Sequence, residues 1–234
     1  MPNVVSHARH IFSRESWEPL AVVELVKISS RKTAFLLRSA SHLQQVVLQS
    51  LGILQQRMQG ETPSAIDVWD EVCTGTYRPK DENSLSDYVK RHLDQDISAH
   101  GIVSSREVEI RRKQGNAPGE RTDIHITGVA PSSSGTGAEQ WRVIVEVKGQ
   151  WHPDLLKAME TQLRDRYLKD NDCSHGIYLV GWYRCPQWDA NDRRNTQNGN
   201  SSHEDLNSKL VAQADGLSDE NQRIDAFVLD ASLR

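Results

Sequence analysis

The sequence predicts an α/β (α+β) fold. Its core has the order helix, three strands, helix, strand, with a further helix and strand after it and a small helical domain before it. Apolar residues recur at helical spacing in residues 41–59, 84–101 and 151–170. Segments with alternating or β-branched residues lie between the last two of these helices. The apolar share of 37% is enough to bury a core, so we do not expect a disordered chain.

Residues 1–78 are expected to form a helical N-terminal region. Within residues 41–59 an apolar stripe recurs every three or four positions, and Gly60 ends the helix. A shorter helix is expected over residues 66–72, and a further apolar run lies at residues 20–28. We interpret this region as an appendage that contacts DNA, supports dimerisation or joins a larger assembly. The apolar stripe consists of Leu43, Val46, Val47, Leu51, Leu54 and Met58.

Residues 79–234 are expected to form the α/β domain. Strong β-branching in residues 141–149 predicts the third strand, and Pro153 lies near the first turn of the helix that follows it. Residues 130–140 are rich in Ser and Gly and are expected to form a hairpin loop. The remaining elements are expected to be strands at 102–112, 121–129, 175–183 and 224–233, and a helix at 203–214.

The composition argues against several classes of protein. No apolar stretch approaches the roughly 20 residues that a membrane-spanning helix needs. The first residues contain no long apolar segment, so we do not expect a secretory signal. The three cysteines form no C-x-x-C pair and are too few for a disulfide scaffold or a four-cysteine zinc site. The formal net charge is -4, so any contact with nucleic acid must use a local basic patch. We therefore expect a cytoplasmic protein that does not bind membranes.

Two carboxylates and a lysine on neighbouring strands form the strongest candidate site. Side chains two residues apart on a strand point to the same face, so Glu146 and Lys148 project together. Asp123 lies on the preceding strand, and a suitable register would bring it beside Glu146. Two such carboxylates repel each other, and a divalent cation relieves that repulsion. Oxygen ligands of this kind suit Mg²⁺ or Mn²⁺, which can activate a water for phosphodiester hydrolysis.

A single Glu-x-Lys triplet is weak evidence, because such triplets arise by chance. The context strengthens it: the triplet ends an apolar strand, an aspartate lies on the strand before it, and a helix follows. The alternative is that Glu146 and Lys148 are solvated residues on an exposed face of the sheet.

At these residues the chain resembles the PD-(D/E)XK nuclease superfamily, which has a restriction-endonuclease-like core. The resemblance is carried by the residues TDI, the segment VEVKG and an amphipathic helix with QL..RY, and it spans roughly residues 81–183. It departs from the family pattern in two ways. Thr122 replaces the proline of the family name, and 22 residues separate Asp123 from Glu146, so the Ser/Gly loop must absorb the excess.

The resemblance implies roles for individual residues. Asp123 and Glu146 would hold the metal with help from the carbonyl of Val147, and Lys148 would serve the attacking water. Gln162 matches a glutamine that several branches carry on the following helix, and it could equally be a surface residue.

Three further residues are accessory candidates. Glu82 matches an acidic residue at the start of the first core helix. It could instead be an ordinary acidic residue that the helix dipole favours at that position. Glu107 could reach the metal region, but a structural pairing with a neighbouring arginine is the simpler role. His125 shares a strand face with Asp123 and could approach the phosphate, or it could be an ordinary half-buried histidine. The candidates for contacts to nucleic acid are Arg111, Arg112, Lys113 and Arg164.

The resemblance therefore implies a Mg²⁺-dependent (or Mn²⁺-dependent) nuclease, and we expect its substrate to be DNA. A weaker similarity to prokaryotic restriction and defence proteins suggests an effector module, a homo-oligomer or a part of a larger defence assembly. Three alternatives stay open: a catalytically inactive nucleic-acid-binding module, a protein-interaction module, and an RNase. Nothing in the residues separates DNA from RNA, because phosphate contacts are common to both.

Overall fold

The computed structural model describes residues 37–98, 102–111, 120–131, 138–197 and 201–234. For residues 107–111, 120–123, 130–131 and 138 it describes the backbone but not the side chains. The compact unit discussed below spans Leu36–Arg234, and the expected apolar run at residues 20–28 lies outside the described residues.

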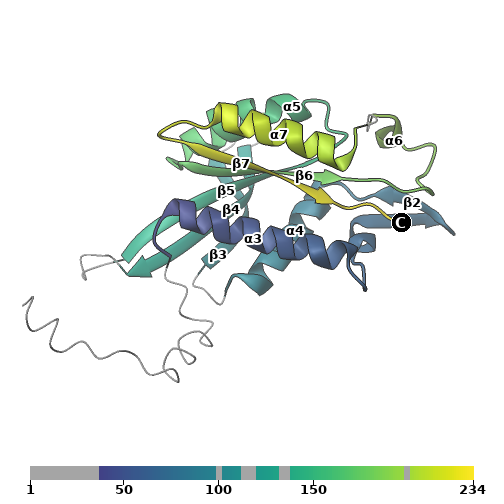
Figure 1. The fold of residues 1–234 in the computed structure, drawn as a ribbon, viewed down its shortest axis with the longest axis horizontal. Coiled ribbons are helices and arrows are strands. Elements are labelled where there is room, and N and C mark those ends of the chain that lie inside the picture. The colour runs from purple at the N-terminus through teal and green to yellow at the C-terminus, as the bar shows by residue number, and fades with distance from the viewer. Residues whose placement is uncertain (1–36, 99–101, 112–119, 132–137, 198–200) are drawn as a thin grey trace, which may run out of the picture. The chain divides into compact units, whose positions relative to one another are not determined.

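A five-stranded mixed sheet forms the centre of this unit, in the order β3-β4-β5-β6-β7 (Figure 1). Strands β3, β4 and β5 form an antiparallel meander, and β6 and β7 then add in parallel. The mixed sheet with its helices confirms the α+β class. The strands are β3 (Ile102–Arg111), β4 (Glu120–Pro131), β5 (Ala138–Gly149), β6 (His175–Trp182) and β7 (Arg223–Asp230).

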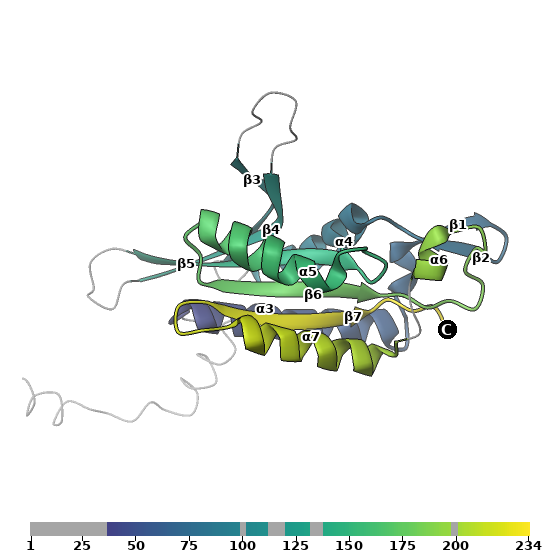
Figure 2. The same cartoon turned by 90° about the horizontal axis from the view of Figure 1, so that it is seen from above.

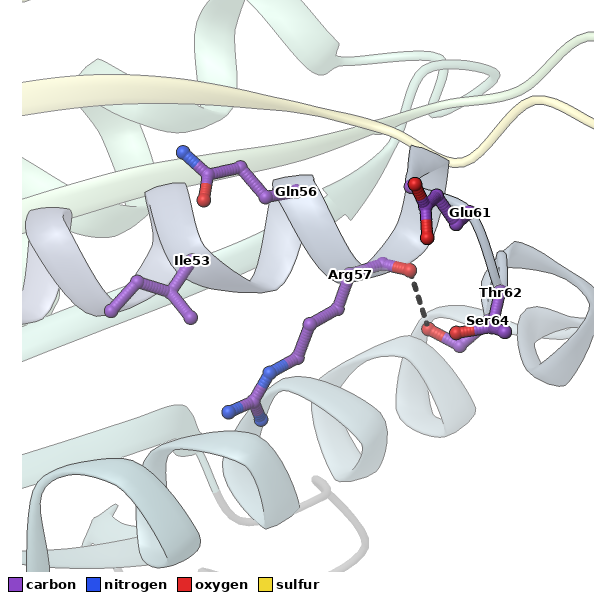
Figure 3. Close-up of a pocket in the computed structure, with 7 residues that line it drawn as sticks. Ile53, Gln56, Arg57, Glu61, Thr62 and Ser64 are labelled. Atoms are coloured by element: carbon purple, nitrogen blue, oxygen red, sulfur yellow. Dashed lines mark hydrogen bonds between the residues drawn. The ribbon is translucent and has the colours of Figure 1, made fainter.

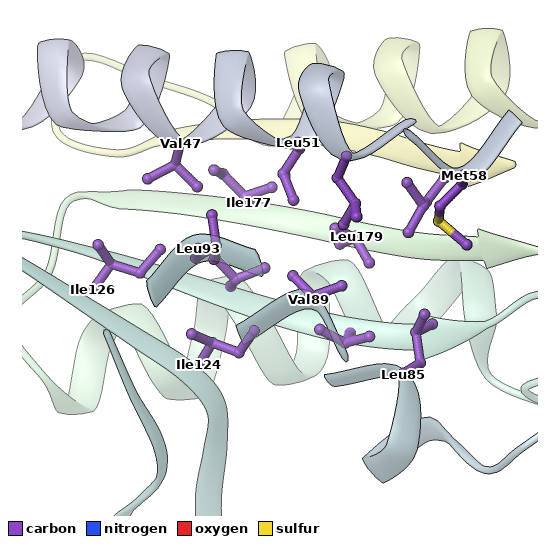
Figure 4. Packing of buried hydrophobic residues seen from close by; sticks show 14 of the residues in the cluster. Val47, Leu51, Met58, Leu85, Val89, Leu93, Ile124, Ile126, Ile177 and Leu179 are labelled. Carbon is purple, nitrogen blue, oxygen red and sulfur yellow. The ribbon is translucent and has the colours of Figure 1, made fainter. Parts of the chain in front are cut away.

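Helices cover both faces of the sheet (Figures 1 and 2). On one face, side chains from α3 and α4 share a core with alternate residues of the central strands, among them Val145 and Ile177 (Figure 4). On the other face, η3 and α7 pack on Ile144 and Tyr178. The helices are α3 (Ala40–Gln59), α4 (Glu82–Asp96), α5 (Leu155–Ala158), which continues as the wide π-helical η3 (Met159–Leu168), α6 (Arg193–Gln197) and α7 (His203–Leu217).

Helix α3 confirms the predicted apolar stripe. Ser39 caps its start by accepting a hydrogen bond from the His42 N–H, and the helix ends at Gln59, before Gly60. Every residue of the stripe is at most 7% exposed, because the stripe lies on the sheet and on α4 (Figure 4). Helix α3 thus belongs to the same compact unit as the sheet, and the unit begins at Leu36. The boundary expected after residue 78 does not coincide with this division.

The prediction of a helix over residues 66–72 is wrong beyond the first turn. A short 3-10 turn, η1 (Ala65–Val68), leads into a hairpin of β1 (Trp69–Cys73) and β2 (Thr76–Pro79). Gly75 makes the hairpin turn at φ 70°, a conformation that a residue with a side chain rarely adopts. Tertiary contacts hold the strand, since the Trp69 indole is buried and donates to the Ala231 carbonyl at 2.7 Å.

Within the described residues, no helix is long and apolar enough to cross a membrane.

Candidate active site

The candidate site lies at the carboxyl end of β5, where the sequence places Glu146 and Lys148. Both side chains are buried, at 1% and 8% exposure, although each carries a charge. Lys148 Nζ lies 2.6 Å from Glu146 Oε1, which makes a close ion pair. The alternative of two solvated residues on an open sheet face is wrong for this pair, because η3 and α7 cover that face of the central strands.

The pairing of β4 with β5 extends to the residue next to each predicted carboxylate. Ile124 in β4 pairs with Val145 in β5, and this is the last pair of the antiparallel ladder at that end. Asp123 directly precedes Ile124, and Glu146 directly follows Val145. The strands meet although 22 residues separate Asp123 from Glu146, because the hairpin absorbs the excess length. The side chain of Asp123 lies outside the described part of the structure.

Glu82 reaches the same strand end from the first turn of α4. Asp81 caps this helix by accepting from the Ser84 N–H, which sets where the helix begins and so places Glu82 at its N-terminus. Glu82 Oε1 accepts a hydrogen bond from the Gly149 N–H at 3.0 Å, directly after Lys148. The carboxylate of Glu82, although it belongs to α4, therefore lies beside the carboxyl end of β5.

Tyr178 shows that the two glutamates share one neighbourhood. Its Cα pairs with that of Glu146, and its hydroxyl donates to the Leu155 carbonyl at 2.7 Å, which ties α5 to the sheet. Burial raises the pKa of the Tyr178 phenol, and the negative charges of Glu146 and then Glu82 raise it further. The phenol therefore stays protonated and keeps its hydrogen bond to α5.

Two residues after the triplet secure the end of β5. The ring of Trp151 lies over Gly149 so closely that a Cβ there would meet ring atoms at 2.4 Å. Gln150 is 7% exposed and extends the sheet through its side chain: it donates to the Tyr183 carbonyl at 3.0 Å and accepts from the Tyr183 N–H at 3.1 Å. Sequence reasoning missed Gln150, since a polar residue after a strand ordinarily signals a loop.

The other predicted site residues are dispersed. The side chain of Val147 is buried in the core beneath α3 and α4, on the opposite face from Glu146. Gln162 lies in η3, is partly exposed, and makes no hydrogen bond within the described residues. His125 lies in β4 with its Cα opposite Ile144, and burial lowers the pKa of its imidazole. Glu107 has its backbone in β3, and its side chain lies outside the described part.

Of the four basic candidates, the structure describes the side chain of Arg164 alone. Arg164 is bound by two carboxylates, Glu160 at 2.8 Å and Asp165 at 2.7 Å, which raise the pKa of its guanidinium. Arg111 ends β3 and its side chain lies outside the description, as do all of residues 112 and 113. Arg164 thus carries a charge that its neighbours already balance.

The described carboxylates do not form a metal site by themselves. Among the side chains that the structure describes, no group of three or more His, Cys, Asp or Glu residues could hold a metal ion. A site at this strand end would therefore need Asp123 as a further ligand.

Two cavities of the described residues lie away from this strand end. One, of about 500 Å³, opens at the carboxyl end of α3, where Ser64 bonds to the Arg57 carbonyl (Figure 3). A second, of about 280 Å³, lies at the amino end of β6 and includes Arg142 and Asp172. Neither is lined by Glu146 or Lys148.

Comparison with known proteins gives one match, to the family model of a domain of unknown function, DUF8371, over residues 64–184. The match covers more than half of the 234 residues. The chain belongs to the DUF8371 family. No curated protein and no solved structure matches it.

The DUF8371 match covers the elements that build the candidate site. It includes the β1–β2 hairpin, α4, the β3–β4–β5 meander, α5 with η3, and β6. Helices α3 and α7 and strand β7 lie outside it. Glu82, Asp123, Glu146 and Lys148 therefore all fall within the family domain.

Proposed function

We propose that this protein is a metal-dependent nuclease of the PD-(D/E)XK type, with a restriction-endonuclease-like core, that hydrolyses phosphodiester bonds in DNA. The observation that carries the proposal is the buried ion pair of Glu146 and Lys148, 2.6 Å apart, at a strand end that Glu82 also reaches. The similarity to restriction and defence proteins extends the proposal to an effector module of such a system.

A stabilising role explains this pair poorly. Removing two charges from water is costly, and a buried ion pair is often no more stable than apolar residues in its place. Buried charges with specific partners gather at functional sites instead, where they are needed for chemistry. The element order around the pair, helix, three strands, helix, strand, also matches the core that the resemblance implies.

The donors at this strand end fit Mg²⁺ or Mn²⁺. Glu146 supplies a buried carboxylate, and Asp123 directly precedes the last β4 residue that pairs with β5. The Val147 carbonyl would add a neutral oxygen. Hard oxygen donors of this kind are the ligands that these ions prefer. When bound, the ion would neutralise charge on the phosphate and lower the pKa of a bound water.

The protein residues would hold and orient the reacting groups. Lys148 would donate to the attacking water or to a phosphate oxygen, since an ammonium offers three N–H donors. Glu82 would fix the end of β5 through Gly149, which keeps Lys148 in place. Gln162, partly exposed on η3, would be available for a hydrogen bond to the substrate.

A cleavage assay tests the proposal. The full chain would be incubated with Mg²⁺ or Mn²⁺ and with supercoiled plasmid, linear duplex DNA, single-stranded DNA and RNA. EDTA, Asp123→Ala and Glu146→Gln should each abolish cleavage. Lys148→Met should slow cleavage by about 10²–10⁴-fold, the usual contribution of a group that moves or positions a proton.

Glu204→Gln is the matched control, because it removes an exposed carboxylate from the first turn of α7. It should cleave like the unchanged protein. Cleavage that survives Asp123→Ala in a folded protein would remove Asp123 from the site. Preference for RNA would replace the DNA assignment with an RNase.

A further inference from the structure

The outer part of one sheet face, on β3 and β4, is open to solvent. The opposite face of these strands is buried under α4, where Ile124 and Ile126 are fully covered. On the open face Val103 is 63% exposed and Val129 is 50% exposed. Helix η3 packs on β5 and β6, and α7 packs on β7, so the helical cover lies over the other half of the sheet (Figure 2).

This open face borders the covered half of the sheet, where Glu146 lies on the same face of β5 under η3. Along β5, the residues Arg142, Ile144 and Glu146 alternate onto one face. In β4, Thr127 lies opposite Arg142 and His125 lies opposite Ile144. At about 3.3 Å per residue, Arg142 lies about 13 Å from Glu146 along the strand, with His125 between them.

Two side chains on this face are suited to an anion. Arg142 is exposed and forms no ion pair with any described residue; its hydrogen bond goes to the Asn171 carbonyl at 3.5 Å. His125 is half-buried, and within the described residues its Nε2 has no hydrogen-bond partner. The two residues lie on neighbouring strands, since His125 pairs with Ile144, two positions from Arg142 along β5.

Hydroxyl groups complete the surface. Ser105 lies opposite His125 on β3 and is exposed, and Thr127 lies between His125 and Val129 on β4. We call the surface formed by Ser105, His125, Thr127 and Arg142 the phosphate track. It offers one fixed positive charge and several polar hydrogen-bonding groups, the combination that contacts a sugar–phosphate backbone without reading its sequence.

We propose that the phosphate track binds the phosphodiester backbone of the substrate strand, with Arg142 and His125 contacting phosphates next to the one that is cleaved. The inference rests on the proposed nuclease function and names residues that would position its substrate. The occupant is a nucleic-acid strand, because the track adds positive charge and lies on the same face of β5 as Glu146, closer to the amino end of that strand.

The test measures binding without cleavage. The full chain in EDTA would be titrated against a fluorescent 30-residue DNA oligonucleotide, duplex and single-stranded, at several salt concentrations and pH 8. Arg142→Ala should weaken binding equally for unrelated sequences. It should reduce the slope of log K against log salt by about 0.9 for duplex or about 0.7 for single strands, the value for one lost phosphate contact. His125→Gln should weaken binding with little change of slope, because it removes a hydrogen-bonding ring and no fixed charge.

Lys209→Ala is the control, since it removes an exposed charge from α7, away from the track. It should leave both affinity and slope unchanged. If the unchanged protein binds DNA and both track variants behave like Lys209→Ala, the track is refuted and the nuclease proposal stands. If the unchanged protein neither binds nor cleaves nucleic acid, both proposals fail. Arg142 is exposed, so its variant should fold and decide the question even if the His125 variant does not.

Discussion

Replacing Lys148 by methionine should destabilise the metal-free protein strongly, because it leaves the buried Glu146 carboxylate without its ammonium partner. Methionine has nearly the length of lysine and no charge, so Lys148→Met changes the electrostatics more than the packing. Glu146→Gln is the reciprocal variant and keeps the shape of the side chain. Both side chains are almost fully buried, so neither charge can be solvated without a local rearrangement.

The expected size of the effect follows from the geometry. For unit charges at the observed 2.6 Å, an effective dielectric constant of about 20 gives an attraction of about 6 kcal/mol. The cost of burying both charges offsets much of this attraction. Removing one partner of a buried pair nevertheless costs about 3–5 kcal/mol, because the remaining charge stays buried. For a chain of 234 residues this corresponds to a drop in Tm of roughly 6–20 °C.

The assay is urea unfolding in EDTA, followed by the fluorescence of the six tryptophans and by far-UV circular dichroism. The two variants and the double variant would form a double-mutant cycle. If Asp123 adds a second carboxylate beside Lys148, Glu146→Gln should lower the free energy of unfolding clearly less than Lys148→Met does. The reason is that Lys148 then keeps one anionic partner. Added Mg²⁺ should then stabilise the unchanged protein, because a ligand of the folded state shifts unfolding by mass action.

An unfolding free energy for Lys148→Met within about 1 kcal/mol of the unchanged protein would refute the argument from burial. Equal costs for the two single variants would contradict a second carboxylate at the site. Glu204→Gln again serves as the exposed control and should change stability by less than about 0.5 kcal/mol.

Two further predictions concern stability. Gln150→Leu would remove both hydrogen bonds between the Gln150 side chain and the Tyr183 backbone, at about 0.5–1.5 kcal/mol each, so the unfolding midpoint should fall. Gln140→Leu changes an exposed glutamine and should not lower the midpoint. Burial, opposed by a hydrogen bond with the Ser50 backbone and by Asp96, lowers the pKa of His92 below its ordinary 6.5. The unfolded chain then binds a proton more readily, so stability should be full above pH 6.5 and decrease as the pH falls from there toward the folded-state pKa. His92→Gln should flatten that decrease in urea unfolding at several pH values, and an unchanged profile would assign it to other groups.

Local pattern was sufficient for most of the elements. The apolar stripe of α3 and the alternation in β4 and β5 report backbone periods of 3.6 and 2, which each segment carries in its own residues. The order of helices and strands from α4 to β7 was predictable for the same reason, except for the short helix α6, which falls in a segment read as a polar loop. The same periodicity puts Glu146 and Lys148 on one face of their strand.

Periodicity could not show which faces would be covered. Glu146 and Lys148 become a buried pair because η3 and α7 pack over that half of the sheet, and the open half exposes Val103. The strand at residues 69–73 replaced an expected helix because Trp69 bonds to Ala231, a residue far away in the sequence.

The sequence by itself determined the α+β class, the order of the core elements and the pairing of a carboxylate with a lysine on one strand. Only the tertiary structure decided that α3 shares the core of the sheet, that Glu82 meets the Gly149 N–H, and that Gln150 closes the end of β5. The reason is physical: a period is a property of neighbouring residues, whereas burial and long-range hydrogen bonds depend on which distant segments pack together.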